Sequence, residues 1–165
     1  ALAVTKADDV AEMRACAATV NALVNDEISL HVRICAAAGI DEATLFSATE
    51  ETANLAYTRY VLDAGHSGDF LDLMAALAPC VLGYGEIGAR LLAASHDAAY
   101  ADWIETYGGE DYQQVCRDVG TLIDDAVLRR LGDQPTKSPR WAGLCQRFAT
   151  ATRLEAGFWQ MGLNR

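Results

Sequence analysis

The sequence has 165 residues, of which 52% are hydrophobic and 22% are charged, and its formal net charge is −10. These values suit one domain with a substantial hydrophobic core. Proteins that bind nucleic acid or anionic membranes normally carry clustered Lys and Arg; the sequence has no such cluster, so we expect neither as a partner. No apolar stretch is long enough and charge-free enough to predict a membrane span.

Almost every segment shows a helical period, beginning with an expected helix over 10–38 that Gly39 ends. Its apolar positions lie near one face and include Val20, Leu23, Val24, Ile28 and Ile34, with His31 among them. We expect a second helix from Asp41 or Thr44, either of which can cap it, to about residue 64. A turn over 65–69 follows it.

A third helix is expected over 70–94, with Ser67 or Asp69 as its cap. Pro79 inside it removes a backbone hydrogen bond and clashes with the preceding turn, so we expect a kink there. A short helix from 95–97 to 107–109, a longer one over 110–131, a loop over 132–139 and a last helix over 140–161 complete the order. Pro139 fits the first turn of that last helix. No strand or hairpin signal occurs, so the sequence predicts a single all-α bundle.

The five cysteines are widely spaced, odd in number and without a Cys-x-x-Cys pair; they stand at positions 16, 35, 80, 116 and 145. This pattern is typical of neither a disulfide framework nor a zinc site. It indicates a reducing, cytoplasmic location. The first residues also lack the basic-then-apolar order of a signal peptide.

Cys80 directly follows Pro79, and Tyr84 lies one helical turn further on, so the phenol shares a helix face with the thiol. The thiolate is the reactive form of cysteine, and a free thiol ionises near pH about 8.5. No histidine lies near Cys80 in the sequence, so a carboxylate from elsewhere is the natural proton shuttle. Alternatively, Cys80 is a small buried hydrophobic residue and Pro79 only shapes the packing.

Glu155 is the best candidate for that carboxylate, because Phe158 and Trp159 follow it at helical spacing. A carboxylate pressed against aromatic rings is desolvated, which favours its protonated form and suits acid–base catalysis. Alternatively, Glu155 is exposed and pairs with Arg153. Further phenols that could form aromatic walls for a flat heteroaromatic ligand stand at Tyr57, Tyr60, Tyr100, Tyr107 and Tyr112.

A metal centre is a different chemistry that helical bundles support, through Glu-x-x-His motifs that hold two irons. Glu27 and His31 stand four residues apart, and neither His66 nor His96 completes such a motif. The histidines are too few and too scattered to predict a metal site.

Three segments, in order and well spaced, resemble the TenA/thiaminase II family. After Tyr57 and Asp69-Phe70 they are ALAPCVLGYGEIG over 76–88, YADWIETYGG over 100–109 and EAGFW over 155–159. The resemblance covers nearly the whole chain and is best from Tyr57 onward. It implies an all-α, heme-oxygenase-like bundle that assembles as a homotetramer and needs no cofactor. It also implies hydrolysis of aminopyrimidines in thiamin salvage, and in many members cleavage of thiamin itself.

The resemblance also implies roles for individual residues. Cys80 would be the catalytic nucleophile that attacks the pyrimidine ring, and Glu155 the carboxylate that shuttles the ring proton. Tyr84 and Tyr107 would orient the thiol and the substrate, and Tyr57 would be a further tyrosine of the binding pocket.

One departure concerns the start of the chain, because the family normally begins several tens of residues earlier with a segment whose aspartate binds the aminopyrimidine. We therefore expect residues 1–165 to form a single TenA-like helical domain that is incomplete at its N-terminus. Such a domain would expose apolar helix faces. Two other functions stay open at this point: a non-catalytic pyrimidine-binding or regulatory bundle, and a metal-dependent oxidase of the same fold.

Overall fold

A computed structural model describes residues 1–94 and 100–164 and contains no β-strand within these ranges, which confirms the all-α prediction. The elements are η1 (Leu2–Lys6), α1 (Val10–Ala22), the π-helical turn η2 (Leu23–Glu27), α2 (Ile28–Ala37), α3 (Glu42–Ser47), α4 (Thr52–Ser67), α5 (Phe70–Ala93), α6 (Ala101–Gly108), α7 (Glu110–Leu131), η4 (Pro135–Lys137) and α8 (Trp141–Leu163).

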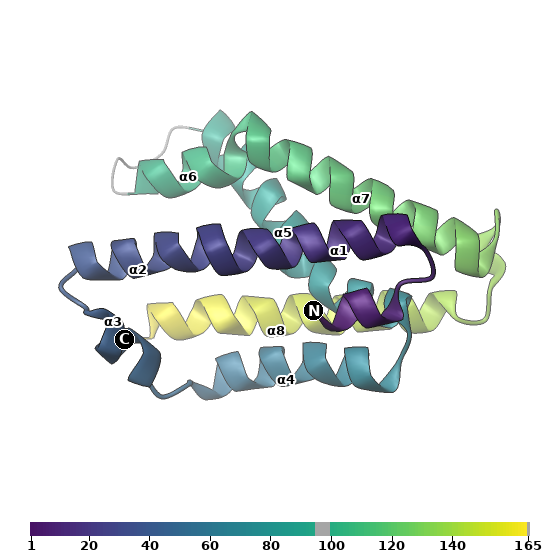
Figure 1. The fold of residues 1–165 in the computed structure, drawn as a ribbon, viewed down its shortest axis with the longest axis horizontal. Coiled ribbons are helices and arrows are strands. Elements are labelled where there is room, and N and C mark those ends of the chain that lie inside the picture. Colours follow the sequence, from purple (N-terminus) through teal and green to yellow (C-terminus); the bar gives the residue numbers. More distant parts are fainter. Residues whose placement is uncertain (95–99, 165) are drawn as a thin grey trace.

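Helix α5 is the centre of the bundle. It packs against α4, α6, α7 and α8 and against the 3-10 turn η1. Helices α4 and α8 lie side by side, and the long α1–α2 segment passes in front of α5 in the view of Figure 1. Residues on α5 therefore meet side chains from most other elements of the fold.

The start of α5 is fixed by a capping box, which confirms Asp69 as its cap. The Asp69 carboxylate accepts hydrogen bonds from the backbone N–H groups of Leu71 and Asp72, and the Asp72 carboxylate accepts one from the Asp69 N–H. Each bond satisfies a donor that the first helical turn leaves free. The helix then runs through Pro79 to Ala93 without interruption, close to the expected 70–94. The kink itself stays a prediction.

The expectation of one helix from 41 or 44 to 64 is wrong. Two helices, α3 and α4, occupy this stretch, and Asp41 caps α3 by accepting a bond from the Thr44 N–H at 2.7 Å. The turn expected over 65–69 is correct only for its last two residues, because α4 continues to Ser67 and α5 begins at Phe70. Gly65 is there for packing: a Cβ at this position would lie 2.5 Å from the Leu2 side chain.

The predictions for the other helices are only partly correct. Helix α7 spans the expected 110–131, whereas α8 begins at Trp141, so Pro139 lies before its first turn and not in it. The expected helix over 10–38 is present as one uninterrupted helical segment. The π-helical turn η2 lies within it, between α1 and α2. The expected helix start at 95–97 lies outside the described residues.

The apolar face of the α1–α2 segment is exposed to solvent. Between 45% and 57% of the surface of Leu23, Val24, Ile28 and Ile34 is accessible. This matches the expectation that the domain exposes apolar helix faces.

Within the described ranges, α5 is long and apolar enough by length and composition to cross a membrane, which corrects the expectation that no stretch meets this test. The central helix of a packed bundle meets the same test. Phe70, Leu71 and Leu73 of α5 are at most 3% exposed and belong to the main hydrophobic cluster. One such helix is therefore weak evidence for a membrane span.

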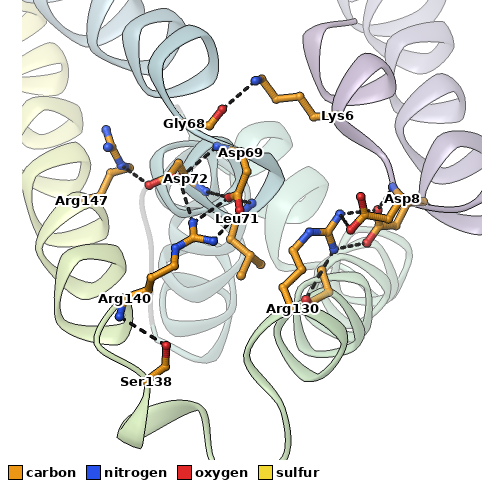
Figure 2. A network of polar contacts seen from close by, with 12 residues as sticks. Lys6, Asp8, Gly68, Asp69, Leu71, Asp72, Arg130, Ser138, Arg140 and Arg147 are labelled. Atoms are coloured by element: carbon orange, nitrogen blue, oxygen red, sulfur yellow. Dashed lines mark hydrogen bonds and ion pairs between the residues drawn. The ribbon is translucent and has the colours of Figure 1, made fainter.

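Two networks of Arg and acidic residues tie the helix ends together (Figure 2). In the first, Arg140 and Arg147 near the start of α8 bind Asp69 and Asp72 at the start of α5. Charge-assisted, bidentate contacts of this kind are stronger than neutral hydrogen bonds. They hold the first turns of α5 and α8 against each other.

The second network joins α1 to α7 through Glu12, which is 1% exposed. Arg130 donates to both of its carboxylate oxygens, at 2.6 and 2.8 Å, and the Arg130 guanidinium lies 4.8 Å from the centre of the Phe70 ring. The hydrogen bond from Arg130 is the main cause that lowers the pKa of Glu12 to about 2; burial opposes it. The folded state therefore favours the ionised carboxylate.

We expect Glu12→Gln to lower the free energy of unfolding by about 3 kcal/mol at neutral pH, because the buried Arg130 guanidinium loses its buried charge partner and keeps only the exposed Asp8. Since the folded pKa of Glu12 is depressed, this stabilisation is complete above the ordinary value of 4.5 and disappears as the pH falls toward about 2. Urea unfolding of both proteins across this pH range measures the difference.

The matched control is Glu86→Gln, which removes an exposed pair with Arg90 on α5 and should cost about 0.5 kcal/mol or less. Equal losses for the two variants would contradict a special role for the buried carboxylate.

Candidate active site

Cys80 lies in the middle of α5, where α4 and α8 pack against it. The thiol is partly buried and donates to the Leu77 carbonyl oxygen at 3.0 Å. It packs against a buried cluster that contains Tyr57 of α4 and Ala151 of α8. Cys80 is therefore placed next to a phenol from one neighbouring helix and a short side chain from another.

Within the part of the chain that the structure describes, two polar atoms near this thiol are buried without a hydrogen-bond partner: the Tyr57 hydroxyl and Glu155 Oε2. Tyr57 and Glu155 are each 8% exposed. Buried polar atoms in proteins are nearly always hydrogen-bonded, so unpartnered ones call for an explanation. The alternative of an exposed Glu155 paired with Arg153 is wrong, because Glu155 is buried and the Arg153 guanidinium donates to Thr150 Oγ1.

The three groups act on one another electrostatically. Burial is the main cause that raises the pKa of Tyr57, and the neighbouring Cys80 and Glu155 raise it further. Burial also raises the pKa of the Cys80 thiol; Tyr57 partly opposes this shift, and the charges of Glu155 and Glu27 add to it. The resting cysteine is therefore a neutral thiol, which must give up its proton when it reacts.

Tyr84 and Tyr107 belong to a cluster of aromatic rings beside the thiol. The Tyr84 ring centre lies 5.1 Å from Tyr107, 5.4 Å from Trp159 and 6.0 Å from Trp103. The pKa of Tyr84 is raised by burial first and then by Glu155, with a smaller effect from Cys80. Tyr84 therefore shares the surroundings of the thiol, as its position one turn along the helix predicts.

Two glycines allow this ring cluster to form. A Cβ on Gly88 of α5 would lie 2.5 Å from the backbone carbon of Tyr107, and one on Gly108 of α6 would lie 2.6 Å from the Gly88 oxygen. The two helices thus touch backbone to backbone. Gln113 of α7 fixes this contact, because its Nε2 donates to the carbonyl oxygens of Gly85 and Tyr107, both at 3.0 Å.

A pocket of about 200 Å³ opens between α5 and α8 beside these groups. Its lining is mostly apolar, with the Glu155 side chain among Pro79, Tyr84, Ile87, Phe148 and Trp159. Such a lining with one acidic group suits a small, flat, partly polar ligand. A wider depression of about 410 Å³ lies where α6 meets α7, lined by residues such as Glu105 and Asp111. Of the five predicted site residues, Tyr84 and Glu155 line the smaller pocket, whereas Tyr57, Cys80 and Tyr107 do not; none of the five lines this depression.

Within residues 1–94 and 100–164, no three His, Cys, Asp or Glu side chains are grouped so that they could hold a metal ion. Glu27 and His31 do form a pair, at 3.5 Å. The five cysteines are free, as their spacing predicts.

The structure brings together Tyr57, Cys80, Tyr84 and Glu155, and Tyr107 joins them through the ring cluster. The sequence patterns assign no separate role to Trp103, although its ring centre lies 4.7 Å from Tyr107. They also assign none to Phe148, which lines the pocket. Helical spacing offered no signal for these residues, because their positions depend on how separate helices pack.

The sequence matches the TENA/THI-4/PQQC family over residues 1–165. It is 38% identical over 168 residues to an uncharacterised protein of Haemophilus influenzae, a match that covers 99% of this chain and 74% of that protein. It is 30% identical over 167 residues to an aminopyrimidine aminohydrolase of Halalkalibacterium halodurans, with 99% of this chain and 72% of the relative covered.

Two solved structures are similar to the whole chain. A TenA family transcription regulator from Silicibacter sp. TM1040 is 61% identical and superimposes with a TM-score of 0.97, over 99% of this chain and 73% of that one. A TenA homologue from P. horikoshii OT3 is 20% identical, with a TM-score of 0.82 over 98% of this chain and 72% of the other, and shows that the fold is shared.

The unpartnered hydroxyl makes a test of stability possible. Tyr57→Phe should leave the free energy of unfolding unchanged or raise it by up to about 1 kcal/mol, because the hydroxyl has no hydrogen bond of normal geometry among the described residues and a buried polar atom is removed. Urea unfolding measures this change.

Tyr112→Phe is the matched comparison, because that hydroxyl donates to the Val81 carbonyl oxygen at 3.3 Å. Its loss should cost about 1 kcal/mol. A loss for Tyr57→Phe as large as that for Tyr112→Phe would show that the Tyr57 hydroxyl has a structural partner.

Proposed function

Since the chain belongs to the TENA/THI-4/PQQC family, we propose that it is a thiamin-salvage hydrolase that converts 4-amino-5-aminomethyl-2-methylpyrimidine to the hydroxymethyl compound and ammonia. The observation that carries this proposal is the pair of unpartnered buried groups, Tyr57 and Glu155, beside the Cys80 thiol. Relatives that are 27% to 30% identical are named aminopyrimidine aminohydrolase, which supports the substrate class.

In the first step the Cys80 sulfur forms a bond to the ring carbon next to the one that bears the aminomethyl group. The thiol proton passes through the Tyr57 hydroxyl to the Glu155 carboxylate, and Glu155 delivers a proton to the adjacent ring nitrogen. A neutral thiol suits this step, because its proton has to be transferred as the S–C bond forms.

In the second step an electron pair of the ring, which is no longer aromatic after the addition, expels the amine from the methylene group, and an exocyclic double bond forms. Water then adds to the methylene carbon, the S–C bond breaks and the ring becomes aromatic again. The sulfur recovers its proton and the amine leaves as ammonia. The sum is one water consumed and one ammonia released, with no oxidant and no cofactor.

The aromatic cluster and the pocket provide the binding site in this proposal. Tyr84, Tyr107 and Trp159 offer ring faces and edges for a pyrimidine, and stacking of this kind favours flat heteroaromatic ligands. Glu155 and the Cys80 thiol both raise the pKa of the Tyr84 hydroxyl, after burial as the main cause. Tyr84 would therefore orient the nucleophile as well as the substrate.

The remaining predictions from the sequence belong to this proposal: one helical domain over residues 1–165, a homotetramer, a cytoplasmic location, and thiamin as a possible second substrate. Ammonia release and thiazole release, measured with equal concentrations of the two compounds, would rank aminopyrimidine against thiamin.

A non-catalytic role is the second candidate, favoured by the name of the 61% identical structure, a TenA family transcription regulator. The two functions differ in one measurement. A regulator would bind the aminopyrimidine at equilibrium without releasing ammonia, whereas the hydrolase would release ammonia in proportion to enzyme concentration.

We expect Cys80→Ser to reduce the rate of ammonia release at least about a hundredfold, because a serine hydroxyl is a far weaker nucleophile than the thiol without a strong base beside it. Binding of the hydroxymethyl product should change little, since the replacement is similar in shape. A coupled ammonia assay and titration calorimetry measure the two effects.

The control is Cys145→Ser on α8, which changes an exposed cysteine and should leave the rate unaltered. Full activity in Cys80→Ser would rule out the nucleophile assignment.

A further inference from the structure

Gly83 lies in the middle of α5, where no packing contact among the described residues requires a glycine. Gly85 and Gly88 on the same helix are required by packing, because a Cβ there would lie 2.4 Å from the Cys116 sulfur or 2.5 Å from the Tyr107 backbone. A Cβ at Gly83 would meet no atom within 4 Å. Gly83 also has no positive φ, so the helix backbone does not require glycine there either.

A glycine inside a helix lowers stability, because it loses more conformational freedom on folding than alanine does. A glycine that neither packing nor backbone conformation requires therefore indicates a use for the space that its side chain would fill. This space belongs to the pocket between α5 and α8, since Gly83 is one of the residues that line that pocket.

Gly83 forms a gap in the pocket wall that α5 provides. Pro79, Gly83 and Ile87 are spaced four residues apart, so they share one face of the helix, and all three line the pocket. The gap thus lies between two larger side chains. Cys80 is three residues before Gly83, which places the gap one helical turn from the sulfur.

Glu155 is independent evidence that this pocket holds a ligand. It lines the pocket from α8, it is 8% exposed, and its Oε2 has no hydrogen-bond partner among the described residues. Most of the remaining lining is apolar, and the Thr152 hydroxyl already donates to the Phe148 carbonyl oxygen at 2.9 Å. A ligand would therefore turn a polar edge toward Glu155 and place an apolar group in the gap at Gly83.

We propose that Gly83 is a specificity-determining residue, whose missing side chain makes room for the methyl group of the substrate's pyrimidine ring. This inference rests on the proposed function, because it takes the substrate from it. In the proposed reaction, the ring nitrogen that Glu155 protonates is bonded to the carbon that bears the methyl group. The methyl group would therefore lie beside the carboxylate, in the same pocket as the gap.

The test compares two ligands that differ only by this methyl group: the hydroxymethyl product and its analogue without the 2-methyl group. The reaction consumes neither compound, so titration calorimetry measures equilibrium binding of both. Gly83→Ala should weaken binding of the methylated ligand at least about tenfold, which is the lower end of what one extra carbon does in an apolar pocket. It should change binding of the analogue less than about twofold, because the added carbon takes the place of the absent methyl group.

Gly120→Ala on α7 is the matched control. A Cβ at Gly120 would also meet no atom within 4 Å, and Gly120 does not line the pocket. This variant should bind both ligands as the unaltered protein does. The urea midpoint of unfolding should stay the same or rise in both variants, because alanine favours a helix over glycine. That measurement separates lost binding from lost folding.

Equal weakening of both ligands by Gly83→Ala, or no weakening of either, would overturn the role of Gly83. A lower urea midpoint would overturn it too, since it would show that a side chain collides there. Ammonia release by the unaltered protein tests the hydrolase separately. Selective loss of the methylated ligand in a protein that releases no ammonia would support the role of Gly83 and overturn the hydrolase. Binding of neither ligand by the unaltered protein would overturn the role of Gly83.

Discussion

Helices α5 and α6 touch backbone to backbone at Gly88 and Gly108, and the geometry of the candidate site depends on this contact. Any side chain larger than hydrogen at Gly88 would meet the Tyr107 backbone at 2.5 Å. The close approach lets the Tyr107 ring reach Tyr84, which lies on the same helix as Cys80, and the Gln113 amide holds α7 against both helices. The aromatic wall is thus a consequence of helix packing and not of any one side chain.

The site carries a cost that the rest of the fold has to offset. An unpartnered buried hydroxyl or carboxylate oxygen costs about 1–3 kcal/mol, and the site holds one of each. Two charge networks contribute stability away from the candidate site. Glu12 pairs with Arg130 where α1 meets α7, and Asp69 pairs with Arg140 where α5 meets α8. The protein therefore separates the residues that stabilise it from the residues left ready for a ligand.

The sequence predicted the fold well wherever local signals and tertiary packing agreed. Helix α7 has clear polar boundaries and Asp69 is a strong cap, so α7 and α5 begin where expected. The prediction failed at Gly65, because a glycine that admits the Leu2 side chain looks in sequence like a glycine that makes a turn. It also failed to divide the stretch before α4, where no Gly or Pro marks the break between α3 and α4.

The candidate site shows the same limit. Helical spacing alone places Tyr84 beside Cys80, but no spacing rule places Tyr57 or Glu155 there, because they come from α4 and α8. The aromatic residues after Glu155 pointed to that carboxylate, and Tyr57 was one of several candidate phenols; only the family resemblance joined the two to Cys80.

The electrostatics of the cleft also bear on when the cysteine reacts. Burial and two carboxylates keep Cys80 protonated, and a protonated thiol resists oxidation and alkylation. The same surroundings contain a phenol and a carboxylate without partners, which can accept and pass on a proton once a basic ring nitrogen is present. In the proposed reaction the thiolate would be generated only as the substrate supplies the acceptor for its proton. Burial and nearby negative charge around a thiol therefore lower its reactivity at rest, and a basic ring nitrogen in the ligand would supply the missing proton acceptor.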